Sequence, residues 1–317
     1  MGHCKSHNIK HFIVILSLLI VKVLLLLMIV SMFYPTFHFL SDSIDSLPNL
    51  SSWKDIQDSY GIIPTLYIGD DEDVINLDIN KIDIAINGDF YKWFNRRGAI
   101  YCTYEAQNSR TPLMFVNPNY LESFPIYDVN GDIIQISESE TSIIILSPLD
   151  PVHDAEIVES FQNRREGLSA LEQAYHIQLA TTDNAIRIIH IAPSQRLFTF
   201  MPGNEYVENA IIQVITENNC LITERVCISG KGLSDPLKIY IGNRFGDIRY
   251  GITTLVKQLE LDDNIKEILP IRNMINIEYR LVWKTILSFV IAVLFIMSLQ
   301  LAIGLLAKKY ICNEASH

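Results

Sequence analysis

Few side chains in this sequence have the type and spacing that catalysis requires. Histidine is the commonest general base, yet four of the eight histidines, at 38, 153, 176 and 190, each stand far from the next. The sequence also lacks G-x-x-x-x-G-K-[ST], G-x-S-x-G, H-E-x-x-H and C-x-x-C, which position phosphates, a nucleophilic serine, zinc or a redox dithiol. We therefore expect a protein that is not an enzyme, with no catalytic residue, no cofactor and no metal site.

Two acidic stretches are candidates for cation binding. Asp128-Val-Asn-Gly-Asp132 has the spaced oxygens of a calcium loop, but it lacks the third acidic position before the glycine and the glutamate six residues after it. A hairpin turn at Asn130 and Gly131 explains this stretch better, because the pair tolerates the positive φ of a type I′ turn. Residues 70–73 are all acidic, and we interpret them as a solvated loop.

Five cysteines are too few for a disulfide scaffold, and an odd number of them, Cys102, Cys220 and Cys227, lie in the central part of the chain. If residues 220–228 form one strand, Cys220 and Cys227 stand about 23 Å apart on opposite faces and cannot bond. A turn at 223–225 would bring them together. A bridge and buried free thiols are therefore both open alternatives.

Two long apolar runs, at 12–33 and 281–307, decide the organisation of the chain. Each exceeds the roughly 18 residues that a helix needs to cross a bilayer. We expect two transmembrane helices with one large domain, residues 34–280, between them. The first run is too long for the apolar core of a cleaved signal, about 7–15 residues, and no small-residue cleavage site follows, so it is predicted to remain as an anchor.

The orientation follows from basic residues on the terminal side of each run, namely Lys5, Lys10, Lys308 and Lys309. Because cytoplasmic flanks carry an excess of lysine and arginine, residues 1–11 and 308–317 should be cytoplasmic and residues 34–280 extracellular. Three basic residues on the central side of the second span oppose this orientation: Arg272 and Arg280 before the run, and Lys284 at its start. The first span usually dominates, so we keep the cell-membrane, multi-pass interpretation with both termini inside.

Lys22 lies at the middle of the first apolar run, about 15 Å from its start at 1.5 Å per residue. A lysine at that depth is costly and normally faces protein or water. It either snorkels toward the inner face, with the span starting deeper, or contacts another helix. The second run contains no acid, so a carboxylate partner would come from another segment or chain. We take Lys22 as a candidate intramembrane helix contact and expect a larger helical assembly.

Between the apolar runs, strand and helix signals alternate, which predicts an α+β domain with mixed sheets. The formal net charge of −11 argues against nucleic acid as a partner. We expect a hairpin between 185–191 and 196–200, with its turn at 193–195. The other strands are expected at 62–68, 99–104, 113–116, 126–129, 132–136, 142–146, 210–216, 220–228 and 237–241. The helices are expected at 90–97, 152–165, 168–179 and 247–259, the last with Asp247 as its N-cap. The helix at 152–165 has Ile157, Val158 and Phe161 at helical spacing, and the helix at 168–179 either stands alone or continues it past Gly167.

Several segments, in their order along the chain, are similar to one family. They are Phe115-Val-Asn-Pro-Asn-Tyr-Leu121, the Asn130-Gly131 hairpin, Ile143-Ile-Ile-Leu-Ser-Pro148, Arg187-Ile-Ile-His-Ile191 with Phe198-Thr-Phe200, and Ala210 through Asn218. Together they resemble the external domain of the bacteriocin-associated integral membrane proteins of Gram-positive bacteria. The resemblance implies an FtsX-like or MacB-like permease layout. It also implies a role in ABC-type export of, or immunity to, peptide toxins.

The expected function is therefore the membrane subunit of an ABC-type permease-like system for bacteriocin or peptide export or self-immunity. Its ATPase would be a separate cytoplasmic chain. Relatives continue into further spans where this sequence ends, so a truncated gene product, a split permease half and a fragment of a longer chain are open alternatives. The alternative is a membrane-tethered extracellular sensor or binding protein for a peptide ligand. The expected partners are the ATPase, other membrane helices from a second copy or subunit, and an extracellular peptide.

Overall fold

The computed structural model describes residues 3–68, 81–105, 111–174, 176–177, 185–242 and 245–314. The acidic stretch 70–73 lies outside these described residues. The chain divides into two compact units, one formed by Met1–Leu47 with Ile277–His317 and the other by Pro48–Asn276. We call the first the helix-pair unit and the second the sheet unit.

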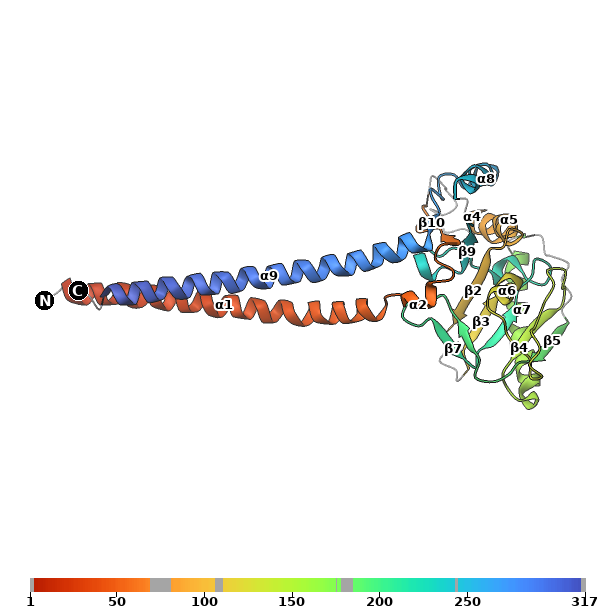
Figure 1. Cartoon of the computed structure of the whole chain (residues 1–317), viewed down its shortest axis with the longest axis horizontal. Coiled ribbons are helices and arrows are strands. Elements are labelled where there is room, and N and C mark those ends of the chain that lie inside the picture. The colour runs from red at the N-terminus through yellow and green to blue at the C-terminus, as the bar shows by residue number, and fades with distance from the viewer. Residues whose placement is uncertain are drawn as a thin grey trace. The chain divides into compact units, whose positions relative to one another are not determined.

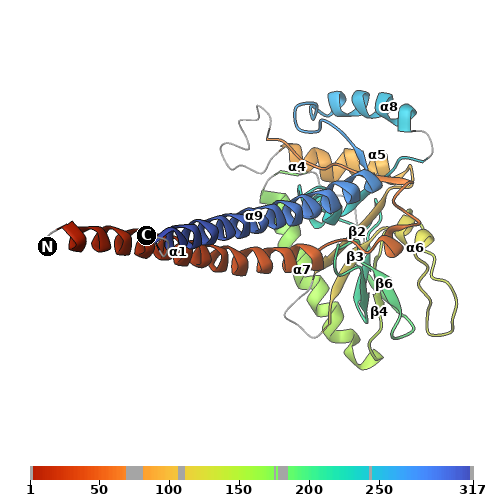
Figure 2. The same ribbon diagram turned by 60° about the vertical axis from the view of Figure 1, so that its left-hand side comes forward.

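The helix-pair unit consists of α1 (His3–Asp45) and the part of α9 (Ile271–Glu314) from Ile277 onward. The two helices run side by side with the two chain termini at the same end (Figures 1 and 2). By length and composition, both helices can cross a membrane. α1 continues twelve residues beyond the predicted apolar run, to Asp45. α9 begins directly after Pro270, a residue that cannot donate a backbone hydrogen bond within a helix.

The sheet unit is built on an eight-stranded sheet with the order β10-β1-β9-β2-β3-β8-β4-β5 (Figure 1). Its strands are β1 (Tyr60–Ile62), β2 (Ile100–Glu105), β3 (Leu113–Val116), β4 (Ile143–Ser147), β5 (Ile186–His190), β8 (Ile211–Val214), β9 (Leu237–Tyr240) and β10 (Leu269–Pro270). A separate pair joins β6 (Arg196–Phe198) to β7 (Tyr206–Glu208). β3 pairs with β8 and β4 with β5 in parallel, while the other neighbours are antiparallel. The predicted mixed-sheet α+β class is confirmed.

Helices cover the sheet and complete its core. They are α2 (Leu50–Trp53), α4 (Lys81–Ala85), a wider helical turn (Ile86–Phe90), α5 (Tyr91–Asn95), α6 (Pro118–Ser123), α7 (Asp154–Ala174) and α8 (Phe245–Gln258). Every residue of β3 and β4 is buried, which explains why these strands are continuously apolar rather than alternating. Ile157 and Phe161 of α7 join the same core as Phe115 of β3 and Ile145 of β4.

The hairpin expected between 185–191 and 196–200 is wrong. β5 pairs in parallel with β4 in the large sheet, whereas β6 pairs with β7. A turn signal at 193–195 cannot distinguish these outcomes, because the partner of β5 lies about 40 residues earlier in the chain. The strand expected at 220–228 is also wrong, since this segment folds around a short helical turn, η3 (Ile222–Glu224).

The turn at Asn130 and Gly131 exists but differs from the expected type. Gly131 has a φ of +88°, while Asn130 is not among the residues with positive φ, which a type I′ turn would require. The Gly131 N–H donates to the carbonyl of Asp128, and one bridge joins Tyr127 to Ile133. The strands expected on either side are reduced to this single bridge.

Three element boundaries also differ from expectation. The strand predicted at 62–68 ends at Ile62. Of the two alternatives left open at Gly167, the continuous helix is the one found, as α7, and it ends at Ala174 rather than at residue 179. A glycine lowers helix stability by only about 1 kcal/mol, and packing overrides that cost. α8 begins at Phe245, so Asp247 lies inside the helix and is not its N-cap.

Candidate functional site

Lys22 lies at a contact between the two long helices. The Gln300 side chain on α9 donates a hydrogen bond from Nε2 to the Lys22 carbonyl at 2.9 Å. A Cβ placed on Gly304, one turn further along α9, would stand 3.4 Å from Lys22 Nζ. The missing side chain of Gly304 therefore makes room for the lysine, as small residues do at close helix contacts. Whether Lys22 also meets a helix of a larger assembly stays a prediction.

Phe33 and Phe289 form a second contact in the helix pair, with ring centroids 6.0 Å apart. Apolar side chains elsewhere on both helices are exposed, including Leu24, Leu27, Ile291, Leu294 and Phe295. The pair thus buries only one stripe of each helix, and the remaining apolar surface needs lipid or further helices to cover it.

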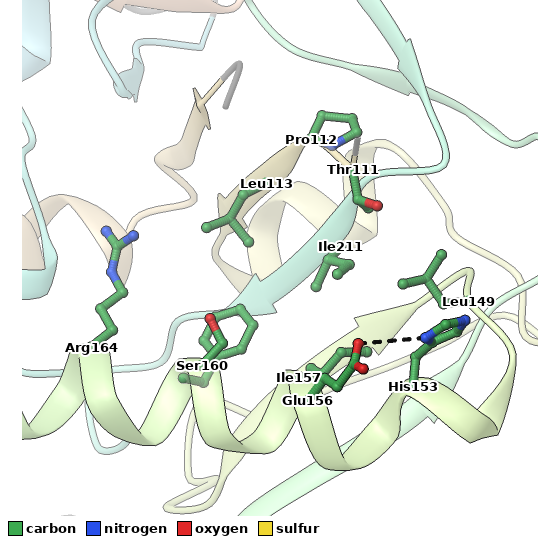
Figure 3. A pocket seen from close by; sticks show the side chains of 11 residues that line it. Thr111, Pro112, Leu113, Leu149, His153, Glu156, Ile157, Ser160, Arg164 and Ile211 are labelled. Atoms are coloured by element: carbon green, nitrogen blue, oxygen red, sulfur yellow. Dashed lines mark ion pairs between the residues drawn. The ribbon is translucent and has the colours of Figure 1, made fainter. Parts of the chain in front are cut away.

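The sheet unit carries an open groove between α7 and the sheet (Figure 3). Its volume is about 500 Å³. The apolar side chains that line it come from α7, β3, β8 and the segment after β4, namely Ile157, Phe161, Leu113, Ile211 and Leu149. Asp150 accepts a hydrogen bond from the Val152 N–H, which holds the short helical turn before α7 and so sets where that helix begins.

Charged side chains stand at the two ends of this groove. At one end, Arg164 forms an ion pair with Glu105 at 3.3 Å, and its guanidinium lies 4.4 Å from the centroid of the Phe115 ring. At the other end, His153 Nδ1 lies 3.6 Å from a Glu156 carboxylate oxygen, as the dashed line in Figure 3 marks. The two ends are eleven residues apart on α7, or about 16 Å. The groove therefore offers an apolar floor between two polar ends.

A histidine on β5 forms polar contacts at the end of the groove where His153 lies. His190 Nδ1 lies 3.1 Å from the Leu149 carbonyl, and its Nε2 lies 3.3 Å from a carboxylate oxygen of Asp154. Within the part of the chain that the structure describes, no three histidine, cysteine or acidic residues are grouped as metal ligands. His190 thus links the segment after β4 to the start of α7.

The buried thiols resolve the cysteine alternatives left open by the sequence. In the part of the chain that the structure describes, Cys102, Cys220 and Cys227 are all free and buried, so Cys220 and Cys227 form no disulfide bridge there. Burial raises the pKa of Cys102 and of Cys227 to about 12. Thiols of that pKa are protonated at neutral pH, and they act here as small core side chains rather than as nucleophiles.

In the calcium-like stretch 128–132, the Asp128 carboxylate is hydrogen-bonded to the backbone of the turn itself. One carboxylate oxygen of Asp128 accepts hydrogen bonds from the backbone N–H groups of Asn130 and Asp132. These hydrogen bonds lower the pKa of the Asp128 carboxyl, and the bond from the Asp132 N–H has the largest effect. The carboxylate stabilises the turn, which agrees with the hairpin interpretation rather than with a calcium loop.

Sequence reasoning singled out Lys22 and the apolar face of α7, but it missed the groove. Arg164 follows Phe161 by three residues and therefore lies on the same helical face, a spacing that could have marked it. Ile211, which lines the groove, and Glu105, which pairs with Arg164 at its end, could not be found in this way. Both are brought there only by the pairing of β2, β3 and β8.

Comparison of the chain with family models, with curated proteins and with solved structures finds no match. We therefore argue its function from the geometry of the two units.

Proposed function

We propose that this protein is the membrane subunit of a permease-like system that exports a peptide toxin or protects the cell from one. Its ATPase would be a separate cytoplasmic chain. The observation that carries the proposal is the helix pair, which joins through Lys22, Gln300 and Gly304 while leaving most of its apolar surface exposed. Two helices cannot enclose a pathway, so the exposed surface would pack against further helices from a second copy or another subunit.

In this proposal both termini are cytoplasmic and the sheet unit is extracellular, because Lys5, Lys10, Lys308 and Lys309 flank the spans on the terminal side. An impermeant thiol reagent applied to intact cells tests this orientation. It should label a Val129→Cys variant, whose side chain is 62% exposed in the native protein, and leave Cys4 and Cys312 unmodified. Labelling of Cys312 would overturn the orientation.

The function itself is tested by deleting the gene in its own host and measuring tolerance to the peptide toxin that the host or its neighbours produce. The deletion strain should become more sensitive, and the full chain should restore tolerance only where the partner ATPase is active. Unchanged tolerance after deletion would refute the proposal.

A second candidate, a membrane-tethered receptor for an extracellular peptide, is favoured by the groove on α7. An apolar floor with polar groups at both ends suits an extended peptide that carries apolar side chains. Ser160 lines the groove and is exposed, whereas Glu159 on the same helix is exposed but does not line it. If the groove receives the peptide, Ser160→Trp should abolish the response to it and Glu159→Trp should not.

These two functions give different results when the ATPase is inactivated. A receptor would still produce its response to the peptide without ATP hydrolysis, while an export or immunity subunit would lose its protective effect. An equal response to the peptide in the Ser160→Trp and Glu159→Trp variants would show that the groove is not the peptide-binding site.

A further inference from the structure

The contacts between α1 and α9 set the depth of Lys22. Lys22 meets Gln300 and Phe33 meets Phe289, so the two contacts lie eleven residues apart on each helix. The middle residue of the second apolar run is Leu294, which lies six residues before Gln300 on α9. Since the helices are antiparallel, the residue opposite it on α1 is Met28, six residues after Lys22. If the second run is centred in the bilayer, the centre of the first span is therefore near Met28 and not near Lys22.

This register moves Lys22 toward one boundary of the bilayer. Lys22 is six residues from Met28, or about 9 Å at 1.5 Å per residue. Half of the hydrocarbon thickness is about 15 Å, so the Lys22 backbone lies about 6 Å inside the boundary, within reach of a snorkelling lysine. The opposite end of the span then extends past Phe33, where α1 continues and Phe37 and Phe39 are still exposed apolar residues.

The Lys22 ammonium lies on the face of α9 that also carries a second lysine. Its Nζ lies against Gly304, and Lys308 follows Gly304 by one helical turn on the same face of α9. Among the described residues, no carboxylate pairs with Lys22. Glu314, the next acid along α9, is ten residues from Gly304, or about 15 Å. Gly304, against which Lys22 Nζ lies, and Lys308 therefore share one face of α9, and among the described residues no ion pair joins Lys22 to an acid.

We propose that Lys22 and Lys308 bind the phosphate of an anionic lipid headgroup at the cytoplasmic boundary of the membrane. The inference rests on the membrane placement in the proposed function. A phosphate suits the site because lysines from both helices are available around Gly304, Lys22 by contact and Lys308 by its position four residues later on α9. The cytoplasmic leaflet is also rich in anionic lipid. A carboxylate on a helix of another subunit would need the same position, and it becomes an alternative outcome of the test.

The test uses the full chain in nanodiscs of phosphatidylcholine with and without phosphatidylglycerol, and it measures bound lipid by native mass spectrometry. Each lysine near an anionic surface contributes on the order of 1 kcal/mol, so Lys22→Leu and Lys308→Leu should each weaken phosphatidylglycerol binding about fivefold. Lys309→Leu is the matched control, since residue 309 lies roughly 140° around the helix from Gly304. An equal loss in the Lys309→Leu variant would overturn the site.

Three further results separate the remaining explanations. Displacement of the lipid by inorganic phosphate would assign the site to a free anion and overturn the lipid assignment. A carbodiimide cross-link that joins Lys22 to a second chain would replace the lipid with a carboxylate partner. Release of the full chain from membranes by alkaline carbonate would refute the membrane placement itself. A chain that resists carbonate but shows no lipid preference would refute only the lipid site.

Discussion

Two neighbouring arginines on α7 provide a direct test of what holds this helix to the sheet unit. Arg165 Nη1 lies 3.1 Å from a Glu224 carboxylate oxygen, and the side chains of the two residues are only 7% and 3% exposed. Arg164 and Glu105 form the adjacent ion pair at 3.3 Å, with side chains 33% and 39% exposed. The same residue type at successive positions of one helix therefore sits in a buried and in a half-exposed pair.

Removal of Arg165 leaves the Glu224 carboxylate buried without this cation. The same carboxylate also accepts the Leu221 N–H at 2.7 Å, so the loop around η3 cannot swing it into water without losing that bond. Breaking a buried pair in this way costs about 3–5 kcal/mol. The half-exposed pair of Arg164 contributes about 0–1 kcal/mol through its charge, and about 1 kcal/mol more through the Phe115 ring.

The assay is urea and thermal unfolding of the full chain in mild detergent, followed by the fluorescence of its tryptophans. Arg165→Met should lower the free energy of unfolding by about 3–5 kcal/mol, which is a shift of roughly 10 °C in a unit of this size. Arg164→Met should lower it by no more than about 2 kcal/mol. Equal losses in the two variants would show that burial does not control the strength of these pairs, and would refute the reasoning.

Three other predictions follow from the sheet unit. Residues 48–276 should fold alone and unfold cooperatively. The shorter segment 54–262 should be less stable, because it lacks both β10 and Trp53, and Trp53 packs on Phe198 and Phe200. Equal urea midpoints for the two segments would contradict this. Gly131→Val should lower the free energy of unfolding by about 1–3 kcal/mol through the positive φ alone, since no atom lies within 4 Å of the added Cβ. Gly167→Ala in α7 should raise the free energy of unfolding by up to about 1 kcal/mol. Unchanged stability of the Gly131→Val variant would show that the turn is unstrained. Burial lowers the pKa of Lys238 from 10.5 to about 8, so its contribution to stability is complete above pH 10.5 and is lost as the pH falls through 8. The free energy of unfolding, relative to Lys238→Met, should therefore rise by up to about 3 kcal/mol between these pH values, and a flat difference would mean that Lys238 is not buried in its charged form.

The amino-acid sequence alone was sufficient for features that depend on local composition. The two apolar runs, the helical face at Ile157 and Phe161, and the buried strands β3 and β4 follow from hydrophobic content and spacing over fewer than 30 residues. The Gly131 turn was also located, because a positive φ favours glycine at that one position.

Pairing between distant segments was decided only by the tertiary structure. The partner of β5 is β4 and not its neighbour β6, since the large sheet buries both faces of β4 and a local hairpin would leave that edge open. The groove exists only because β8 lies beside β3, which brings Ile211 to Leu113. The contact of Lys22 with Gln300 depends in the same way on the register between two helices, since these residues are more than 270 positions apart in the chain. Single-chain periodicity carries no information on register, because the free energy that selects it comes from contacts between segments and not from the segments themselves.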